Sequence, residues 1–511
     1  MSTPPGIGII GGGASAVCLL DSLSRGPRAP EAVTVFDPSP HLWRGRAYQP
    51  DSSALRVNAP PEDMTVRADG PEHFIGWLSA RQAVLGDTTD HTDPLSGIPF
   101  PPRSLYGDYL EQSARGALGR LASRGCRIRL VREAVTDLVP DGGTLTAVTS
   151  TGDRYALAHA VLCVGTGVPA DPHGLAGAPG FVADPYPVAR RLDGIGAQDR
   201  VVVVGSGLTA VDVVLSLAAG GHQGSVVLAS RRGVLPSVRQ QPLEHALRHF
   251  TAERFRSMAA RGETCTLGQA VALMEAELTD AGSSMAAVDR EISAVAAEKP
   301  LDRLRRQLGS VRDRDPGLRI LQRAVPDTGP DIWTLLPEAD RVAVLRRHYR
   351  TIMSLCCPMP PSSAEILLGR AEKGLLEFSG GLERITARPG GGFDVCATGG
   401  TRRADVVVNA VNPPAHRVPP AADPLVSSLI RRGLATAHPR GGLHVDRATS
   451  GLVTDGVPSR RIHALGDLAA GSLFFTFGVP SLVDRAVDIA GAVLRQEDPA
   501  AGRRTGSVPA V

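Results

Sequence analysis

The chain has 511 residues, of which 42% are apolar and 21% are charged, and its formal net charge is +3. This composition is typical of a globular protein of two or three domains, and the near-neutral charge gives no electrostatic reason to expect nucleic acid or an anionic membrane as a partner. The sequence shows neither a signal-peptide pattern nor an apolar run of membrane-spanning length, so we expect a cytoplasmic protein.

Seven cysteines are scattered along the chain without a CxxC pair. Their odd number and their spacing argue against a disulfide framework, a zinc site and a dithiol redox centre, and we expect no bound metal. The adjacent Cys356 and Cys357 are interpreted as part of a core helix in preference to a redox-active disulfide.

The first structural signal is a short apolar strand that ends at Ile10, followed by a glycine turn and a helix. In such turns the first glycine permits the tight bend, the next lets the backbone approach a pyrophosphate, and a small residue lets the helix pack on the strand. A second strand, 32–36, ends in an acid, which at this point accepts hydrogen bonds from a ribose diol. The pattern predicts a bound dinucleotide, with an ordinary βα turn as the alternative. The expected binding residues are Gly11, Gly13, Ala14, Ser15, Ala16 and Asp37.

The remainder of the first lobe alternates between helical and strand patterns. We expect two helices with a polar surface loop between them, then a hairpin and a buried closing strand. The expected helices are 73–84, ending at Gly86, and one from 106 onward, with the loop at 87–102 between them. The expected strands are 126–130 and 134–138, with a turn at 141–143, and the closing strand is 160–164, followed by Gly165-Thr166-Gly167.

The same scheme then repeats. An apolar strand at 201–204 leads into a second glycine turn and a helix, and the next strand, 225–230, ends in Arg231-Arg232 where the first unit has an acid. An arginine pair suits a ribose 2′-phosphate by charge and by bidentate geometry, which favours NADPH over NADH; a solvated basic turn is the alternative. The expected binding residues are Gly205, Ser206, Gly207, Leu208, Thr209, Arg231 and Arg232.

The late half of the unit is repeated as well, with strand-like segments between residues 374 and 410. Two copies of one layout predict an α/β fold with two Rossmann-like, doubly wound lobes. The segment 236–366 between the halves of the second lobe is mostly helical, and we expect an insert that roofs the site. Its expected helices are 245–258, 267–278, 285–297 and 341–353.

The last signal is a short strand that ends in Gly466-Asp467, followed by a final helix from Pro480 to Leu494. A polar tail at the end of the chain is expected to be disordered. The expected domains are 1–170 completed by 413–495, then 171–235 with 367–412, the insert 236–366, and the tail 496–511.

The order of the motifs GGGASA, GTG, GSGLTA, SRRG and GD resembles that of flavoproteins with paired FAD and NAD(P) domains. More narrowly, Val57-Asn58-Ala59-Pro60, Pro102-Arg103 and the Tyr106-Gly107 and Tyr109-Leu110 pairs resemble one bacterial FAD/NAD(P)-binding family, similar to flavin-containing and N-hydroxylating monooxygenases. The resemblance spans nearly the whole chain and implies FAD in the first lobe and NADPH in the second.

The resemblance also implies further flavin contacts. Asp467 would hold the ribityl hydroxyls, and the N-terminus of the last helix would face the pyrimidine edge of the flavin. Asn58, Met64, Gly165 and Gly466 are expected near the cofactor. The run 474–478, with Phe475 and Thr476, is expected there as well, with a plain core as the alternative.

We therefore expect an FAD-dependent, NADPH-consuming monooxygenase. Oxygen would pass from a flavin C4a-hydroperoxide to a small nucleophilic substrate, an amine or an electron-rich heterocycle. One form of this reaction is N-hydroxylation in specialised metabolism. No catalytic dyad or triad is found, and for an amine the reaction needs shielded geometry in place of a general base. The alternatives are a flavin reductase that does not oxygenate its substrate and a non-catalytic flavin-bound sensor or partner subunit.

Two departures from the family bear on the substrate. Relatives carry a basic run before the Met-Pro-Pro at the end of the insert, where this chain has Ser354-Leu355-Cys356-Cys357-Pro358-Met359. If that run contacts the substrate, a less anionic or more apolar substrate is expected for this chain. The segment 180–186 has neither the His nor the Trp of the Baeyer–Villiger pattern, which makes insertion of oxygen into ketones less favoured.

Overall fold

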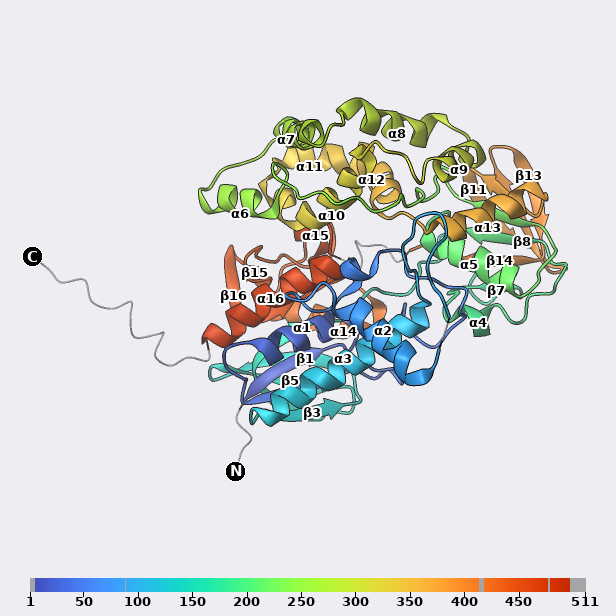
Figure 1. Ribbon diagram of the computed structural model, residues 1–511. Helices are drawn as coiled ribbons and strands as arrows, with labels where there is room; N and C mark the ends of the chain where they lie inside the picture. The colour runs from blue at the N-terminus through green and yellow to red at the C-terminus, as the bar shows by residue number, and fades with distance from the viewer. Residues whose placement is uncertain (1–4, 88, 413–417, 477, 497–511) are drawn as a thin grey trace, which may run out of the picture.

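The computed structural model describes residues 5–87, 89–412, 418–476 and 478–496 and arranges them as two α/β lobes with a layer of helices above them (Figure 1). The predicted fold class, α/β with two Rossmann-like lobes, is confirmed. Most of the expected tail and Phe477 of the aromatic run lie outside the described residues. In the part of the chain that the structure describes, no helix is both long enough and apolar enough to cross a membrane.

The first lobe is built on five parallel strands in the order β16, β6, β1, β2, β3. Ile7 and Ile9 of β1 face one layer of helices, and Ile10 faces an antiparallel β-layer on the other side, as the two-residue period of a strand requires. The elements are β1 (Gly6–Ile10), α1 (Ala14–Arg25), β2 (Ala32–Phe36), η1 (Pro61–Met64), α2 (His73–Leu85), α3 (Arg103–Ser123), β3 (Arg127–Val131), β4 (Val135–Asp141), β5 (Thr144–Thr149), β6 (Arg154–Leu162), α14 (Asp423–Arg431), β15 (Gly451–Thr454), β16 (Val457–Ala464), η4 (Asp467–Ala469), α15 (Ala470–Leu473) and α16 (Val479–Gln496).

The second lobe repeats this plan with a parallel sheet in the order β10, β9, β8, β14, β7. Val201 and Val203 of β8 pack against helices, while Val202 and Val204 face a three-stranded antiparallel layer. The elements are β7 (Phe181–Val182), α4 (Val188–Arg191), β8 (Val201–Val204), α5 (Leu208–Ala219), β9 (Val226–Ala229), α13 (Pro361–Glu372), β10 (Leu376–Ser379), β11 (Leu382–Ala387), β12 (Phe393–Ala397), β13 (Gly400–Ala404) and β14 (Val406–Asn409).

A helical insert enters the second lobe between β9 and β10, and it forms the upper layer in Figure 1. In the first lobe the equivalent connection, from β2 to β3, carries only α2, α3 and a short 3-10 turn. The insert contains α6 (Ala252–Ala260), α7 (Leu267–Asp280), α8 (Met285–Ala297), α9 (Pro300–Gly309), α10 (Gly317–Leu335), α11 (Glu338–Ala343), a π-turn (Val344–His348) and α12 (Tyr349–Cys356). The expected limits of the lobes and of the insert stay predictions.

Two expectations for the insert were wrong or incomplete. The helix expected from residue 245 begins only at Ala252, because the backbone N–H groups of Arg248, His249 and Phe250 donate instead to the buried carboxylate of Glu277. The helix α10 was not anticipated, since it contains Pro326 and Pro330, which remove backbone donors. Burial of its central residues outweighs that loss.

The polar segment 87–102 is not simply a surface loop. The carboxylate of Asp93 is buried and accepts hydrogen bonds from the backbone N–H groups of Leu95, Ser96 and Ser362. The last of these donors lies in the first turn of α13 in the second lobe. The segment therefore links the two lobes.

A buried ion pair also joins the lobes. Arg103, at the start of α3, donates to the carboxylate of Asp212 on α5, and Tyr186 donates to the same oxygen. The side chains of Arg103 and Asp212 are 12% and 4% exposed, so the pair is held in a region with little water. Because Asp212 lies on the helix after the second glycine turn, this pair positions that turn against the first lobe.

The seven cysteines are all free thiols. Cys356 is buried at the end of α12, and Cys357 follows as its C-cap. The interpretation of this pair as part of a core helix in preference to a disulfide is confirmed for Cys356, while Cys357 lies just beyond the helix.

Candidate functional site

The first glycine turn has the geometry that a dinucleotide turn requires. Gly11 adopts φ +104°, and a Cβ atom there would lie 2.1 Å from the carbonyl oxygen of Cys163 at the end of β6. Only glycine fits this close approach of two strands. Gly13 is the N-cap of α1 and makes no side-chain cap, so the N-terminal N–H groups of the helix stay available to an anion.

Asp37 lies at the end of β2, beside this turn. Its carboxylate accepts hydrogen bonds from the backbone N–H groups of Gly12, at 2.5 Å, and Ser39, at 2.6 Å. These bonds fix the carboxylate at the strand end, and a carboxylate oxygen has a further lone pair for a ribose hydroxyl. The expected grouping of Gly11, Gly13 and Asp37 is present.

The Gly466-Asp467 pair lies against the same turn although it is more than 400 residues away in the sequence. Gly466 adopts φ +98°, and a Cβ atom there would lie 3.3 Å from Oγ of Ser15, in the first turn of α1. The carboxylate of Asp467 has no hydrogen-bond partner among the described residues, and burial raises its pKa to about 6. An unpartnered, partly buried carboxyl group beside a phosphate-binding turn fits the hydroxyl groups of a flavin side chain.

A second polar group near the end of the chain also lacks a hydrogen-bond partner among the described residues. The hydroxyl of Thr476 is buried and finds no partner among the described residues. Buried hydroxyl groups are normally hydrogen-bonded, so Thr476 is suited to a polar atom of a bound molecule. The residues at the first turn therefore fit FAD, and contact of Asp467 and Thr476 with the cofactor stays a prediction.

The insert covers this region with aromatic side chains. Phe475 packs against α10, where a Cβ atom on Gly329 would lie 2.7 Å from the Cβ of Phe475. Trp333 of α10 stacks on Phe474 with ring centroids 4.5 Å apart, and Tyr349 of α12 meets the same ring edge-on at 6.2 Å. We call this cluster of rings, which joins the insert to the segment after Asp467, the aromatic roof.

The other residues expected near FAD lie in different surroundings. Asn58 lies where the first lobe meets the end of the insert, with its side-chain amide donating to the carbonyl of Pro358 at 3.4 Å. Met64 is buried in the core of the first lobe, and its carbonyl accepts a hydrogen bond from Tyr106. Gly165 is exposed after β6 with φ +70°. Their contact with the cofactor stays a prediction.

The second glycine turn has nearly the same backbone as the first. Gly205 adopts φ +126°, and a Cβ atom there would lie 2.8 Å from the carbonyl oxygen of Ala410. Gly207 is the N-cap of α5, with Leu208 and Thr209 in its first turn. Ser206 donates to the carbonyl of Val234 at 2.7 Å, which ties the turn to the segment after β9.

Arg231 and Arg232 follow β9 and are exposed at the position that Asp37 occupies in the first lobe. Gly11 to Asp37 and Gly205 to Arg231 are both separated by 26 residues. Neither guanidinium group forms an ion pair with a residue that the structure describes. The structure adds Arg350 of α12, which the sequence analysis missed because it lies 118 residues beyond Arg232.

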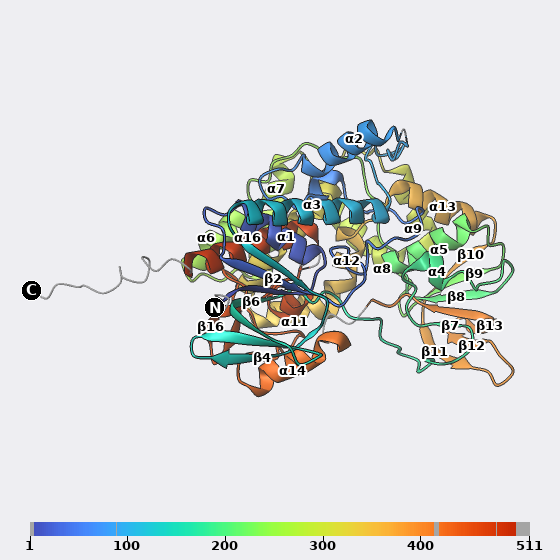
Figure 2. The same ribbon diagram turned by 90° about the horizontal axis from the view of Figure 1, so that it is seen from below.

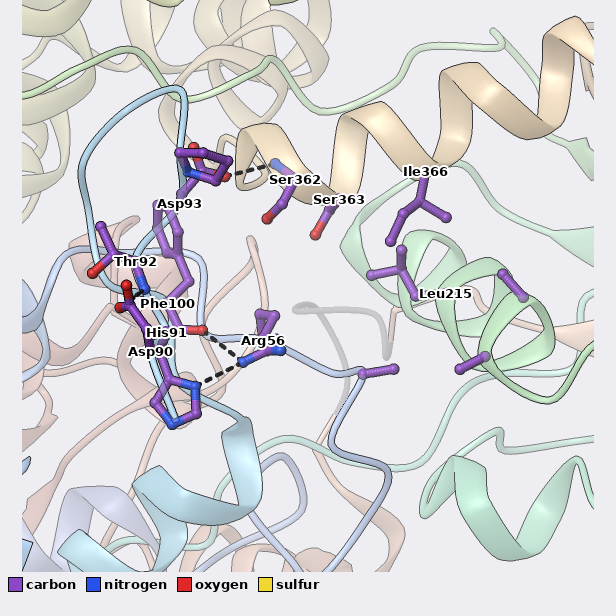
Figure 3. A pocket seen from close by; sticks show the side chains of 14 residues that line it. Arg56, Asp90, His91, Thr92, Asp93, Phe100, Leu215, Ser362, Ser363 and Ile366 are labelled. Atoms are coloured by element: carbon purple, nitrogen blue, oxygen red, sulfur yellow. Dashed lines mark hydrogen bonds between the residues drawn. The ribbon is translucent and has the colours of Figure 1, made fainter. Parts of the chain in front are cut away.

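A cavity of about 500 Å³ lies apart from both turns (Figure 3). It lies between the loop that carries Asp90 to Pro94, the helix α5 and the first turns of α13. Arg56 lies on its floor and donates to the carbonyl of Phe100 at 3.3 Å. None of the residues expected to bind a cofactor lines this cavity, so it is separate from the dinucleotide sites.

Comparison with known proteins shows what this chain is similar to. Residues 8–167 match the model of the FAD-NAD(P)-binding family. No curated protein sequence matches the chain. Similar solved structures include an ornithine N-hydroxylase, KtzI, from Kutzneria sp. 744, with reduced FAD, NADP⁺ and L-ornithine; it is 15% identical, with a TM-score of 0.60 over 97% of this chain and 100% of that one.

Two other similar structures are a second ornithine hydroxylase and a disulfide reductase. Ornithine hydroxylase PvdA from Pseudomonas aeruginosa is 15% identical with a TM-score of 0.54, over 96% of this chain and 99% of that one. Bacillithiol disulfide reductase Bdr from Staphylococcus aureus is 11% identical with a TM-score of 0.50, over 97% and 99%. These likenesses establish the fold. The expected resemblance is confirmed: residues 8–167 match the model of the FAD-NAD(P)-binding family, and the whole chain has the fold that N-hydroxylating monooxygenases share.

Proposed function

We propose that this chain is an FAD-dependent monooxygenase that consumes NADPH and oxygenates a small nucleophilic substrate, an amine or an electron-rich heterocycle. For an amine, one atom of O₂ becomes the oxygen of a hydroxylamine and the other leaves as water, while NADPH and a proton are converted to NADP⁺ and supply the two electrons. Bound FAD supplies the two-electron chemistry and the activation of O₂.

The observation that supports the proposal is the aromatic roof beside Asp467. Trp333, Phe474 and Tyr349 come from three different elements and contact one another, and Tyr349 lies close enough to Asp467 to interact with its charge. A site that transfers oxygen must keep water away from a reactive oxygen species, whereas a site that only passes electrons to an acceptor does not need this shielding. The roof therefore supports oxygen transfer.

The residues of the chain have separate tasks in this proposal. The N-terminus of α1 with Gly11 and Gly13 would hold the FAD pyrophosphate, Asp37 would bind its adenosine ribose, and Asp467 with Thr476 would orient the flavin end. The turn at Gly205 with the Arg231-Arg232 pair would hold NADPH. The likeness to ornithine hydroxylases supports an amine as the substrate class.

A reductase that does not oxygenate its substrate is the second candidate, because the fold is also that of the bacillithiol disulfide reductase. The scattered free thiols offer no dithiol pair for disulfide exchange within the described residues. That observation speaks against a thiol-based reductase and leaves reductases that use other acceptors.

The deciding experiment combines stopped-flow spectroscopy with isotope labelling. FAD-loaded protein is reduced by NADPH without oxygen, then mixed with ¹⁸O₂ in the presence of a panel of amines and heterocycles. Oxygen transfer predicts a transient flavin spectrum after mixing and one ¹⁸O atom in the product for each NADPH consumed. NADPH consumption that yields hydrogen peroxide alone across the panel, or reduction of an added acceptor without incorporation of ¹⁸O, would instead support the reductase.

A further inference from the structure

Three arginines from two parts of the chain lie together beside the second glycine turn. Arg231 and Arg232 follow β9, and Arg350 lies in the first turn of α12 in the insert. All three are exposed, and none of them forms an ion pair with any residue within the described ranges. Partial burial and, to a smaller extent, the charges of Arg231 and Arg232 lower the pKa of the Arg350 guanidinium.

The position of α12 follows from a set of short hydrogen bonds. Ser354 of α12 donates to the carbonyl of Leu235 at 2.6 Å, and its own carbonyl accepts the backbone N–H of Ser237 at 2.8 Å. Arg303 of α9 bridges the same two partners, donating to Leu235 and to Ser354. Hydrogen bonds therefore hold the helix against the segment that starts at Leu235, three residues after the arginine pair.

The helical repeat then sets where Arg350 lies. Residues four apart lie on the same face of a helix, so Arg350 shares the face of α12 that Ser354 fastens to Leu235, one turn nearer the N-terminus. In Figure 1 α12 lies in the layer above the lobes, and in the view from below in Figure 2 it projects onto the region between them. The insert thus brings a third guanidinium to the end of β9.

Like charges without a counterion destabilise one another unless an anion binds between them. The cluster has the composition of a phosphate site, because guanidinium groups bind phosphate oxygens with paired, charge-assisted hydrogen bonds. In the first lobe the equivalent strand end carries Asp37, which is satisfied by backbone N–H groups. The contrast indicates that the second strand end is completed by a ligand anion.

We infer that Arg350 completes the site for the 2′-phosphate of NADPH, so that the insert takes part in choosing NADPH over NADH. The inference rests on the proposed function, since it deepens the assignment of NADPH to the second lobe. Arg350 is a specificity-determining residue here and takes no part in the transfer of hydride or oxygen. The same helix carries Tyr349, which contacts Phe474 in the roof, so α12 joins the phosphate site to the cover over Asp467.

The test measures binding of nucleotide fragments to the FAD-loaded protein by calorimetry, without turnover. The fragments 2′,5′-ADP and 5′-AMP differ only by the 2′-phosphate. Loss of a charge-assisted hydrogen bond predicts that Arg350→Gln weakens binding of 2′,5′-ADP by about tenfold or more and changes binding of 5′-AMP by less than about twofold. Arg350→Lys keeps the charge without the planar fork, and we expect an intermediate loss.

The matched control is Arg290→Gln, which removes the same charge from an exposed position on α8. It should leave both affinities within about twofold of the wild-type values, because Arg290 is not among the charges that act on Arg350 and an exposed charge is screened by salt. Circular dichroism and the flavin absorbance confirm that each variant is folded and loaded; if Arg350→Gln fails this check, the comparison is made with Arg350→Lys.

Three results would overturn the inference. In the first, Arg350→Gln binds 2′,5′-ADP as tightly as Arg290→Gln does. In the second, it weakens 2′,5′-ADP and 5′-AMP equally. In the third, the wild-type protein itself binds the two fragments equally, which also removes the assignment of NADPH to Arg231 and Arg232. Failure of oxygen transfer leaves these binding results unchanged, so the two proposals fail separately.

Discussion

The two glycine turns share a backbone and differ in what surrounds it. Both place a glycine with positive φ against the neighbouring strand, both donate its N–H to the end of the second strand at 2.8 Å, and both start a twelve-residue helix after a glycine N-cap. The strand end carries an acid held by backbone N–H groups in the first lobe, and in the second an arginine pair that forms no ion pair with the described residues. We therefore expect the turn to hold a pyrophosphate in either lobe and the strand end to decide which ribose binds.

The helices after the turns differ as well. The fifth residue of α1 is Cys18, buried in the core of the first lobe, whereas the fifth residue of α5 is Asp212, which pairs with Arg103 of the first lobe. The first turn is therefore part of a self-contained core, and the second is docked to its neighbour through a polar contact. This asymmetry leads to four predictions.

The largest effect is expected from alanine at the first turn glycine. Gly11→Ala would add a Cβ atom 2.1 Å from a backbone carbonyl and force an L-residue to φ +104°, with about 1–3 kcal/mol of backbone strain in addition to the collision. We expect purified Gly11→Ala to lose nearly all of its FAD, as measured by flavin absorbance. The matched variant, Gly205→Ala, should keep its FAD, but NADPH should reduce that FAD at least about 100-fold less efficiently than in the wild-type protein. Equal FAD content in both variants would contradict the division of tasks between the lobes.

The contact that docks the second lobe comes next. Asp212→Asn leaves Arg103 buried without its counter-charge, so we expect a loss of about 3–5 kcal/mol in the free energy of unfolding. Chemical denaturation measures it. The control is Glu377→Gln, which breaks the exposed pair between Glu377 and Arg402 on the surface of the same lobe and should cost about 1 kcal/mol or less. Similar losses in both variants would show that the contact between the lobes is no stronger than a surface pair.

The strand-end charge is the sharpest difference between the lobes. We expect the double variant Arg231→Gln/Arg232→Gln to lower the preference for NADPH over NADH by about 100-fold, because two charge-assisted contacts to phosphate are removed. The ratio of flavin reduction efficiencies with the two nucleotides measures it, and reduction by NADH serves as the internal control. A preference that survives this double change would mean that Arg231 and Arg232 are only a solvated turn.

The smallest expected effect concerns Asp467 and depends on pH. The pKa of this carboxyl group is raised to about 6 in the fold, so its stabilising contribution is complete below about pH 4, the usual pKa, and is lost as the pH rises through about 6. In FAD-free protein, Asp467→Asn should therefore gain about 1–3 kcal/mol of stability relative to wild type between pH 4 and pH 7.

Thermal unfolding of the FAD-free proteins across this pH range provides the measurement. The control is Asp289→Asn on the exposed side of α8, which should show no such change in relative stability. Addition of FAD should reverse the ranking at neutral pH, because the variant lacks the carboxylate that holds the cofactor. A pH-independent difference between Asp467→Asn and wild type would contradict the buried position of this carboxyl group.

The amino-acid sequence by itself determined the two turns, the strand ends and the class of fold. A glycine at a positive φ, an apolar strand of four or five residues and a charged residue at the strand end are local features, and each depends mainly on neighbours within one βα unit. For that reason Gly11, Asp37, Gly205 and Arg231 were found at the expected strand ends. The repeat of the pattern was enough to predict two lobes.

Only the tertiary structure decided how the helices of the insert form and which residue lies beside the arginine pair. The helix α10 forms despite two prolines because its centre is buried, and the start of α6 is displaced because Glu277 takes the backbone N–H groups before it. Arg350 joins Arg231 because Ser354 fastens α12 to Leu235. Such contacts join residues about 30 to more than 100 positions apart, and their free energy comes from burial and pairing in three dimensions, which a local sequence pattern does not contain.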